Sequence, residues 1–143
     1  MTYNNLILLF LLIVGGLSAQ KDGDIVFRKD KVFTQWNSIG IIFIEDSTPM
    51  VYYSDGRVNR TTLKNYINHK KFDIKRIDEE GFIDNESAKN MHIYVKAKLD
   101  IACGNISFVW DIYRQELGVP LCKHNDKTIK NIYKCYFLES LDL

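Results

Sequence analysis

The first half of the chain alternates short apolar runs with polar clusters. The apolar runs are rich in β-branched and aromatic residues, and the clusters between them hold the Asp, Ser, Thr, Pro and Gly residues that favour turns. Thr61 or Thr62 can cap a short helix that extends to about Asn68. The pattern therefore predicts four strands, over residues 24–28, 39–45, 49–54 and 72–77.

The spacing of apolar residues becomes helical in the second half of the chain. Asn85 is a good helix N-cap, and the apolar residues behind it recur every three or four positions: Ala88, Met91, Val95 and Leu99. A second stripe starts behind Asn105 and ends before a Gly and a Pro: Ile106, Val109, Trp110, Tyr113 and Leu117. Two further strands are predicted over residues 119–121 and 133–138. Together these elements predict one α+β domain.

The N-terminus differs from the rest of the chain in carrying no charged side chain before Lys21. Residues 6–14 are all apolar and are followed by small residues up to Ala19, which is the outline of a secretory signal peptide. A membrane span needs roughly 20 apolar residues, so this run is too short for one. We expect cleavage near Ala19 or Gln20 and export to the periplasm or the medium, leaving residues 21–143 as a single domain. An uncut anchor and a buried N-terminal helix are the alternatives.

Composition narrows the class of protein. The chain of 143 residues holds 19 Lys and Arg against 18 Asp and Glu, a formal net charge of +1, which argues against nucleic-acid binding by phosphate neutralisation. Export would let two of the three cysteines form one disulfide, in any of three pairings. Cys122–Cys135 is the pairing we favour, and the alternative is that all three cysteines are buried as small apolar side chains.

Three stretches, in order along the chain, carry a family resemblance. They are Gly-Asp-Ile-Val-Phe-Arg at 23–28, the run at 38–63 that begins Ser-Ile-Gly-Ile-Ile, and Phe-Val-Trp-Asp-Ile-Tyr at 108–113 followed by Leu-Gly-Val at 117–119. Together they resemble the YiiX/YebB-type proteins, relatives of the NlpC/P60 cysteine hydrolases. The resemblance implies a circularly permuted papain-like fold, with a small antiparallel sheet packed against helices. It also implies an ancestral cleft for peptide, amide or acyl substrates.

The catalytic positions of that family carry other residues here. Such hydrolases need a thiolate nucleophile, a His base and a polar group that orients the His. On the resemblance, the His position falls on Ser38, the Glu position on Tyr53 and the Cys position on Asn105. A hydroxyl is no base near neutral pH, and an amide is no nucleophile. Asn105 is expected instead to cap its helix.

These losses predict a pseudoenzyme: an exported protein that binds a peptide, a cell-wall fragment or a protein partner without hydrolysing it. Its ligand-binding candidates are aromatic residues that are either exposed or part of the core: Trp36, Tyr52, Tyr53 and Tyr94. Trp36 would flank the old His position. The size of the chain and its predicted export also permit an inhibitor or immunity partner of a cell-wall hydrolase.

The alternative function is an active amidase or peptidase on cell-wall or peptide amide bonds. It would use Cys103, two residues before Asn105, as the nucleophile. Two observations argue against this alternative. Two steps along a helix turn a side chain by about 200°, away from the direction of Asn105, and no His falls in the strand at 39–45 to act as the base. We expect no cofactor. Cys122-Lys123-His124 lacks a second pair of ligands at zinc-like spacing, so we expect no metal site either.

Overall fold

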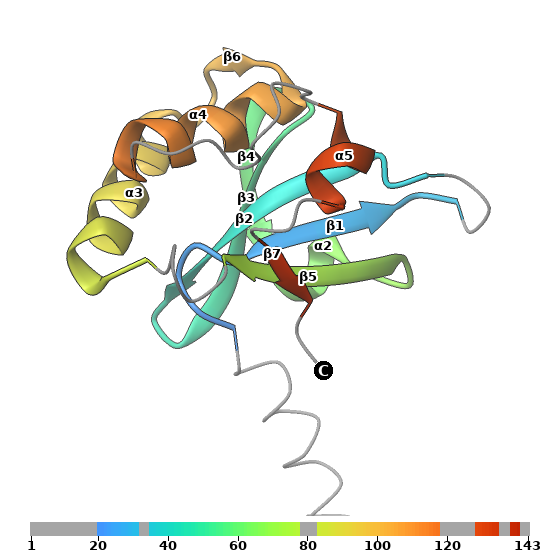
Figure 1. Ribbon diagram of the computed structural model, residues 1–143, viewed down its shortest axis with the longest axis horizontal. Coiled ribbons are helices and arrows are strands. Elements are labelled where there is room, and N and C mark those ends of the chain that lie inside the picture. The colour runs from blue at the N-terminus through green and yellow to red at the C-terminus, as the bar shows by residue number, and fades with distance from the viewer. Residues whose placement is uncertain (1–19, 32–34, 78–82, 118–127, 135–137, 141–143) are drawn as a thin grey trace, which may run out of the picture.

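The computed structural model describes residues 20–31, 35–77, 83–117, 128–134 and 138–140. Its strands and helices follow one another as shown in Figure 1. The strands are β1 (Ile25–Lys29), β2 (Ser38–Glu45), β3 (Thr48–Ser54), β4 (Gly56–Thr62), β5 (Lys71–Ile77), β6 (Ala102–Cys103) and β7 (Leu138–Ser140). The helices are α2 (Leu63–Tyr66), α3 (Asn85–Ala97), α4 (Asn105–Leu117) and α5 (Ile129–Tyr133).

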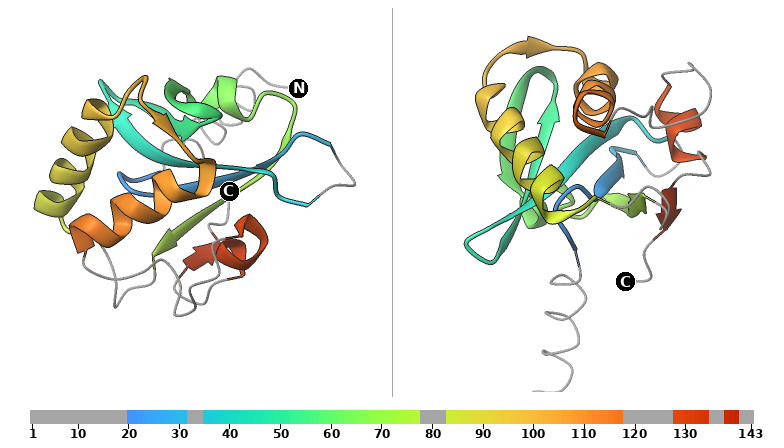
Figure 2. Two further views of the ribbon diagram at one scale, coloured as in Figure 1. Left: turned by 90° about the horizontal axis from the view of Figure 1, so that it is seen from above. Right: turned by 60° about the vertical axis from the view of Figure 1, so that its left-hand side comes forward.

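The strands form one sheet in the order β6-β4-β3-β2-β1-β5-β7, and each pair of neighbours is antiparallel. Helices α3 and α4 lie together over one face of this sheet (Figure 2). The short helix α2 packs on the opposite face, as its buried residues show. This α+β arrangement of an antiparallel sheet and a few helices agrees with the predicted fold class.

Two cores result from the alternation of side chains along the strands. Ile25 and Phe27 of β1 point to the face covered by α3, α4 and α5, whereas Val26 points to the α2 side. In β2 the same alternation sends Ile41 and Phe43 to the larger core and Ile42 to the smaller one. Since successive residues are buried on both faces, β1 and β2 read as nearly continuous apolar runs in the sequence.

The four strands predicted in the first half are present, but β4 was not predicted. Its sequence, GRVNRTT, is mostly polar, and in the structure Val58 is its one fully buried residue. Tyr133, predicted to begin a strand, instead ends α5, and β7 starts at Leu138. The strand predicted over residues 119–121 lies outside the described residues.

The cap of α3 differs from the prediction by one residue, whereas the cap of α2 agrees with it. Asp84, and not Asn85, caps α3, because its carboxylate accepts a hydrogen bond from the Ser87 backbone N–H at 2.7 Å. Thr62 caps α2 as predicted, with its hydroxyl accepting from the Asn65 N–H at 3.1 Å. Within the described part of the chain, no helix is both long and apolar enough to cross a membrane.

A polar cluster ties α3 to the β2–β3 hairpin. The carboxylate of Glu45 lies 2.6 Å from Nε2 of His92 and 3.1 Å from the Arg60 guanidinium, and it also accepts the Tyr52 hydroxyl. The His92 ring stacks on Phe43 with 4.7 Å between the ring centroids. Burial opposes ionisation of Glu45, but the hydrogen bonds from Tyr52 and His92 and the charge of Arg60 outweigh it, so its pKa is lowered.

This lowered pKa predicts acid sensitivity. A carboxyl group that titrates lower in the folded state than in the unfolded chain stabilises the fold above its ordinary pKa of 4.5. That contribution is lost as the pH falls through the folded-state pKa. We expect Glu45→Gln to be destabilising at pH 7 and less destabilising at pH 3, measured by urea unfolding at both pH values. Glu86→Gln, at an exposed position of α3, is the control and should change stability little at either pH.

Candidate functional site

Ser38 opens β2 and is buried between the strand and α2. Its hydroxyl lies 2.5 Å from the hydroxyl of Tyr66, the last residue of α2. Burial raises the pKa of Tyr66 to about 12, against the opposing effects of the Ser38 hydrogen bond and the Arg28 charge. The phenol is therefore neutral near pH 7 and cannot serve as a base for Ser38. Ser38, which the resemblance matches to the family's His, thus forms a satisfied pair of hydroxyls with Tyr66.

Asn105 is the first residue of α4, but it is not the N-cap. The Gly104 carbonyl accepts the first hydrogen bond of the helix, from the Phe108 N–H at 3.1 Å, so the predicted capping role of Asn105 is wrong. The Asn105 side chain donates instead to the Asn37 carbonyl at 3.4 Å. Its Oδ1 is buried and has no hydrogen-bond partner among the described residues. Asn105 thus lies beside the residue that precedes Ser38.

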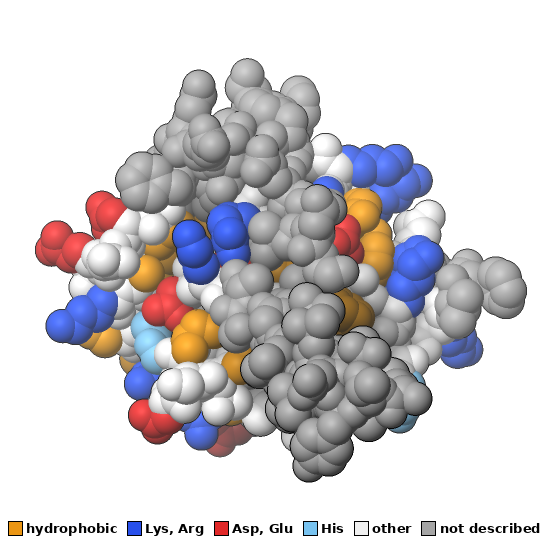
Figure 3. Space-filling view, turned by 90° about the horizontal axis from the view of Figure 1, so that it is seen from below, with side chains coloured by type: hydrophobic (Ala, Val, Ile, Leu, Met, Phe, Trp, Pro, Cys, Tyr) orange, Lys and Arg blue, Asp and Glu red, His pale blue; other side chains and the backbone are white. Residues whose placement is uncertain are grey.

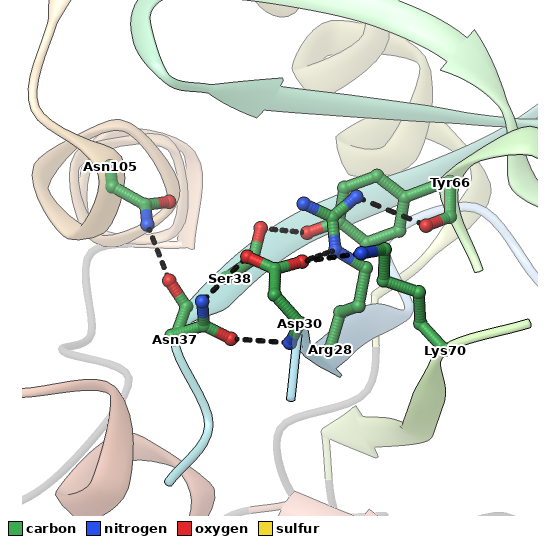
Figure 4. Close-up of polar contacts among 7 residues, drawn as sticks. All are labelled: Arg28, Asp30, Asn37, Ser38, Tyr66, Lys70 and Asn105. Atoms are coloured by element: carbon green, nitrogen blue, oxygen red, sulfur yellow. Dashed lines mark hydrogen bonds and ion pairs between the residues drawn. The ribbon is translucent and has the colours of Figure 1, made fainter. Parts of the chain in front are cut away.

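A network of charged and amide side chains joins Asn37, which contacts Asn105, to Tyr66 of α2 (Figure 4). Asp30 accepts from the Asn37 amide at 2.6 Å and pairs with Arg28 at 3.1 Å and Lys70 at 3.5 Å. Arg28 also donates to the Tyr66 carbonyl at 3.0 Å and stacks over the Tyr66 ring, 4.3 Å from its centroid. Burial disfavours the Asp30 carboxylate, yet the Asn37 hydrogen bond and the two cations lower its pKa overall.

Tyr53 lies in β3 opposite Gly40 and faces the smaller core. Its ring centroid is 5.1 Å from that of Tyr66, whose hydroxyl in turn meets Ser38. Tyr66 therefore connects Tyr53 with Ser38 on the α2 side of the sheet. Asn105, at the start of α4 on the other side, reaches the backbone carbonyl of Asn37, the residue before Ser38. The linked groups are two phenols, a hydroxyl and two amides.

Cys103 lies apart from this network, at the edge of the sheet in β6. Its thiol is free and partly buried, and the residue pairs with Gly56 of β4. Burial and the negative charge of Asp111 raise its pKa, outweighing Lys98 and the Gly104 N–H. A raised pKa reduces the thiolate fraction, which is the nucleophilic form. Cys122 and Cys135 lie outside the described residues, so the predicted disulfide stays a prediction.

The aromatic candidates occupy different environments. Trp36 is partly buried, with its ring centroid 4.9 Å from that of Tyr133 and the Lys29 ammonium 4.7 Å above it. Tyr52, considered as an exposed ligand contact, is fully buried and donates to Glu45, so it is a core residue. Tyr94 borders an open hollow of about 370 Å³ between α3 and α4, together with Asp111, Arg114 and Gln115. This hollow is built from other residues than the Ser38 network.

Four members of the site were not predicted from the sequence: Arg28, Asp30, Asn37 and Tyr66. Tyr66 is 28 residues from Ser38 in the chain and lies in the short helix predicted behind Thr61 or Thr62. Its hydroxyl meets Ser38 because β1, β2 and α2 pack together, and no local sequence pattern carries that information.

The variant Tyr66→Phe tests the hydrogen bond between the Tyr66 and Ser38 hydroxyls. The change removes one hydroxyl and leaves the buried Ser38 hydroxyl without its partner, so we expect a loss of about 1–2 kcal/mol of folding stability. Tyr53→Phe is the matched control, since no hydrogen bond of its hydroxyl is found within the described ranges. Urea unfolding of both variants measures the difference. Equal stability of the two variants would contradict the assigned hydrogen bond.

Metal binding finds little support in the residues around these sites. No group of three or more His, Cys, Asp or Glu side chains is placed to hold an ion in the part of the chain that the structure describes. The best partial set is Glu45 with His92, which are already paired with each other at 2.6 Å. Two ligands in mutual contact fall short of the three or four that a zinc site uses.

The fold is similar to a solved structure. The crystal structure of the metalloprotein YiiX (DUF1105) from Escherichia coli O157:H7 superposes with a TM-score of 0.71, covering 85% of this chain and 96% of that one at 15% sequence identity. No family model matches the sequence, and no curated protein matches it either. At this identity the likeness establishes a YiiX-like fold.

Proposed function

We propose that this chain is an exported, non-catalytic member of the permuted papain-like class, which binds a peptide, a cell-wall fragment or a protein partner. The observation that carries the proposal is the composition of the linked site. Ser38 and Tyr53 contact Tyr66, and Asn105 donates to the Asn37 carbonyl next to Ser38, but none of Ser38, Tyr53 and Asn105 is a thiol, an imidazole or a carboxylate.

The chemistry of the neighbouring groups supports the same proposal. Thiol hydrolysis needs a nucleophile within hydrogen-bond reach of a base. Arg28 is the cross-strand partner of Ser38, and Arg28 and Asp30 are both held in the ion-pair network with Lys70. A carboxylate whose pKa is lowered by the Asn37 hydrogen bond and two cations is a poor proton acceptor near neutral pH.

A metal-dependent reaction is not part of the proposal, although the similar structure is that of a metalloprotein. The described residues of this chain do not supply the three ligands that such a site requires. The alternative of a Cys103 hydrolase is disfavoured by the raised pKa of that thiol. The groups that act electrostatically on it are Asp111 and Lys98, and the described histidines are not among them.

Export belongs to the proposal through the charge-free leader, residues 1–20. It would place the domain where peptides and cell-wall fragments are accessible.

The proposed function is tested by offering the purified protein a mixture of muropeptides from digested cell wall. We expect backbone amide NMR shifts confined to residues near Asn37, Ser38 and Asn105, with no new products by mass spectrometry. Asn105→Ala should weaken the shifts, and Lys89→Gln, at an exposed site on α3, should not. Hydrolysis that is abolished by Cys103→Ala would overturn the proposal in favour of a thiol hydrolase.

A further inference from the structure

Two lysines face each other across neighbouring strands near the candidate site. In the β1–β5 ladder, Lys29 is the direct partner of Lys71, at the end of β1 and the start of β5. Directly opposed residues of an antiparallel pair point to the same face with their Cβ atoms about 5 Å apart, and like charges there are destabilising. The fold therefore keeps an unfavourable pair at this place.

Further cations surround this pair. Arg28, Lys31 and Lys70 lie within two residues of it along the chain, and Asp30 is the one carboxylate in the described stretches 28–31 and 70–71. Asp30 is shared between Arg28 and Lys70, at 3.1 and 3.5 Å. With Asp73, two residues after Lys71, this end of the sheet holds five cations against two carboxylates, whereas the whole chain has a net charge of only +1. We call Arg28, Lys29, Lys31, Lys70 and Lys71 the basic strand end.

The basic strand end borders the linked site. Arg28 touches Tyr66 and Asp30 contacts Asn37, the residue beside Ser38 and Asn105. In Figure 3, which keeps the left and right of Figure 1, Lys and Arg prevail among the visible charges on the right-hand side, where β1 ends and β5 begins. The Lys29 ammonium lies over the partly buried Trp36 ring, and Lys71 is exposed to solvent.

We propose that the basic strand end recognises carboxylate groups, so that the partner of this protein is an acidic peptide segment. This inference rests on the proposed function and specifies the chemical class of its peptide ligand. A carboxylate placed between Lys29 and Lys71 would turn their repulsion into two attractions. Lys29 lies over Trp36 and Arg28 over Tyr66, on opposite sides of the strand, so an acidic chain at the strand end meets cations on both sides.

A membrane surface fits these observations less well. The large apolar side chains that are exposed in the described residues, Ile93 and Ile101, belong to α3 and the β6 approach and not to the basic strand end. Nucleic acid fits poorly too, because its binding depends on many phosphate contacts and on exposed aromatic rings for stacking. Trp36 is already engaged by Tyr133 and Lys29.

The test measures binding of hexaglutamate and hexaglutamine peptides to the purified protein by isothermal titration calorimetry in 50 mM salt. We expect hexaglutamate to bind and hexaglutamine to bind at least tenfold more weakly. The variant Lys29→Gln/Lys71→Gln should bind hexaglutamate about tenfold more weakly. The control variant Lys89→Gln/Lys96→Gln changes two exposed lysines of α3 and should bind like the wild type.

A stability measurement separates recognition from folding. Since Lys71→Gln removes one member of the like-charge pair, its thermal midpoint should equal or exceed that of the wild type while its affinity for hexaglutamate falls. Equal affinity of wild type and double variant would overturn the inference. So would tighter binding to vesicles of 30% phosphatidylglycerol in phosphatidylcholine, or to a single-stranded DNA decamer, than to hexaglutamate. Equal binding of hexaglutamate and hexaglutamine would overturn the inferred preference for acidic peptides but not the proposed function. Hydrolysis of either peptide would overturn the proposed function.

Discussion

Replacing Trp110 by Ala is expected to lower the free energy of unfolding by about 4 kcal/mol. Trp110 is 1% exposed and is the largest fully buried side chain among the described residues. It projects from α4 into the larger core, which includes Ile39 and Ile41 of β2. Truncation removes this apolar surface and leaves a cavity that a strand and a helix cannot close by small shifts. Urea unfolding followed by circular dichroism measures the loss.

Ile93→Ala is the control for Trp110→Ala. Ile93 lies on the neighbouring helix α3 and is 59% exposed, so its truncation should cost less than about 0.5 kcal/mol. Because Asn105 starts the helix that Trp110 anchors, we also expect Trp110→Ala to shift the amide signals of Asn37 and Ser38. A loss below about 1 kcal/mol would show that α4 is not held by this side chain.

The second large effect is expected at Asp24, which is 1% exposed. Its two carboxylate oxygens accept from Nε and Nη2 of Arg76 at 2.8 and 2.9 Å, and the Lys21 N–H donates to Oδ2 at 2.8 Å. Asp24→Asn removes the negative charge that pairs with the Arg76 guanidinium. We expect a loss of about 3 kcal/mol, the lower end for a broken buried pair, since Arg76 is partly exposed.

Asp46→Asn is the matched control for Asp24→Asn. Asp46 is exposed in the β2–β3 turn with φ of 50°, a conformation that Asn tolerates well, so stability should change by less than about 0.5 kcal/mol. Thermal unfolding of the two variants at pH 7 gives the comparison. Equal midpoints would mean that the Asp24–Arg76 pair contributes nothing net, as happens when desolvation cancels attraction.

The dipeptide Gly23-Asp24, which precedes β1, helps to place that strand beside its two neighbours. Gly23 has φ of +92°, which favours glycine, and a Cβ there would come within 2.3 Å of the Ile83 side chain. Its N–H donates to the Ile42 carbonyl at 2.8 Å, which sets β1 beside β2. Asp24 then reaches β5 through Arg76. The Gly-Asp dipeptide that carried part of the family resemblance thus has a structural role.

Most strands and both long helices were predictable because their signals are local. Alternation along residues 72–77 and helical spacing behind Asn105 each reflect one element burying one face. The sequence did not predict β4, because β4 is held by backbone pairing with β3 and β6. Its mostly polar side chains give no sign of that pairing. Tyr133 was assigned to a strand because an aromatic residue suits a strand, whereas packing on Phe27 and the bond to Asp73 hold it at the end of α5.

By itself, the sequence determined the α+β class, which local apolar patterns carry. That Ser38, Tyr53 and Asn105 stand at the catalytic positions of the resembled family stays a prediction. The tertiary structure decided what surrounds these residues. It joined Tyr66, Arg28 and Asn37 to Ser38 and Asn105, and it set Lys29 against Lys71. These contacts link residues that are far apart in the chain. Strand register and helix packing determine which residues meet, and no short stretch of sequence encodes either of them.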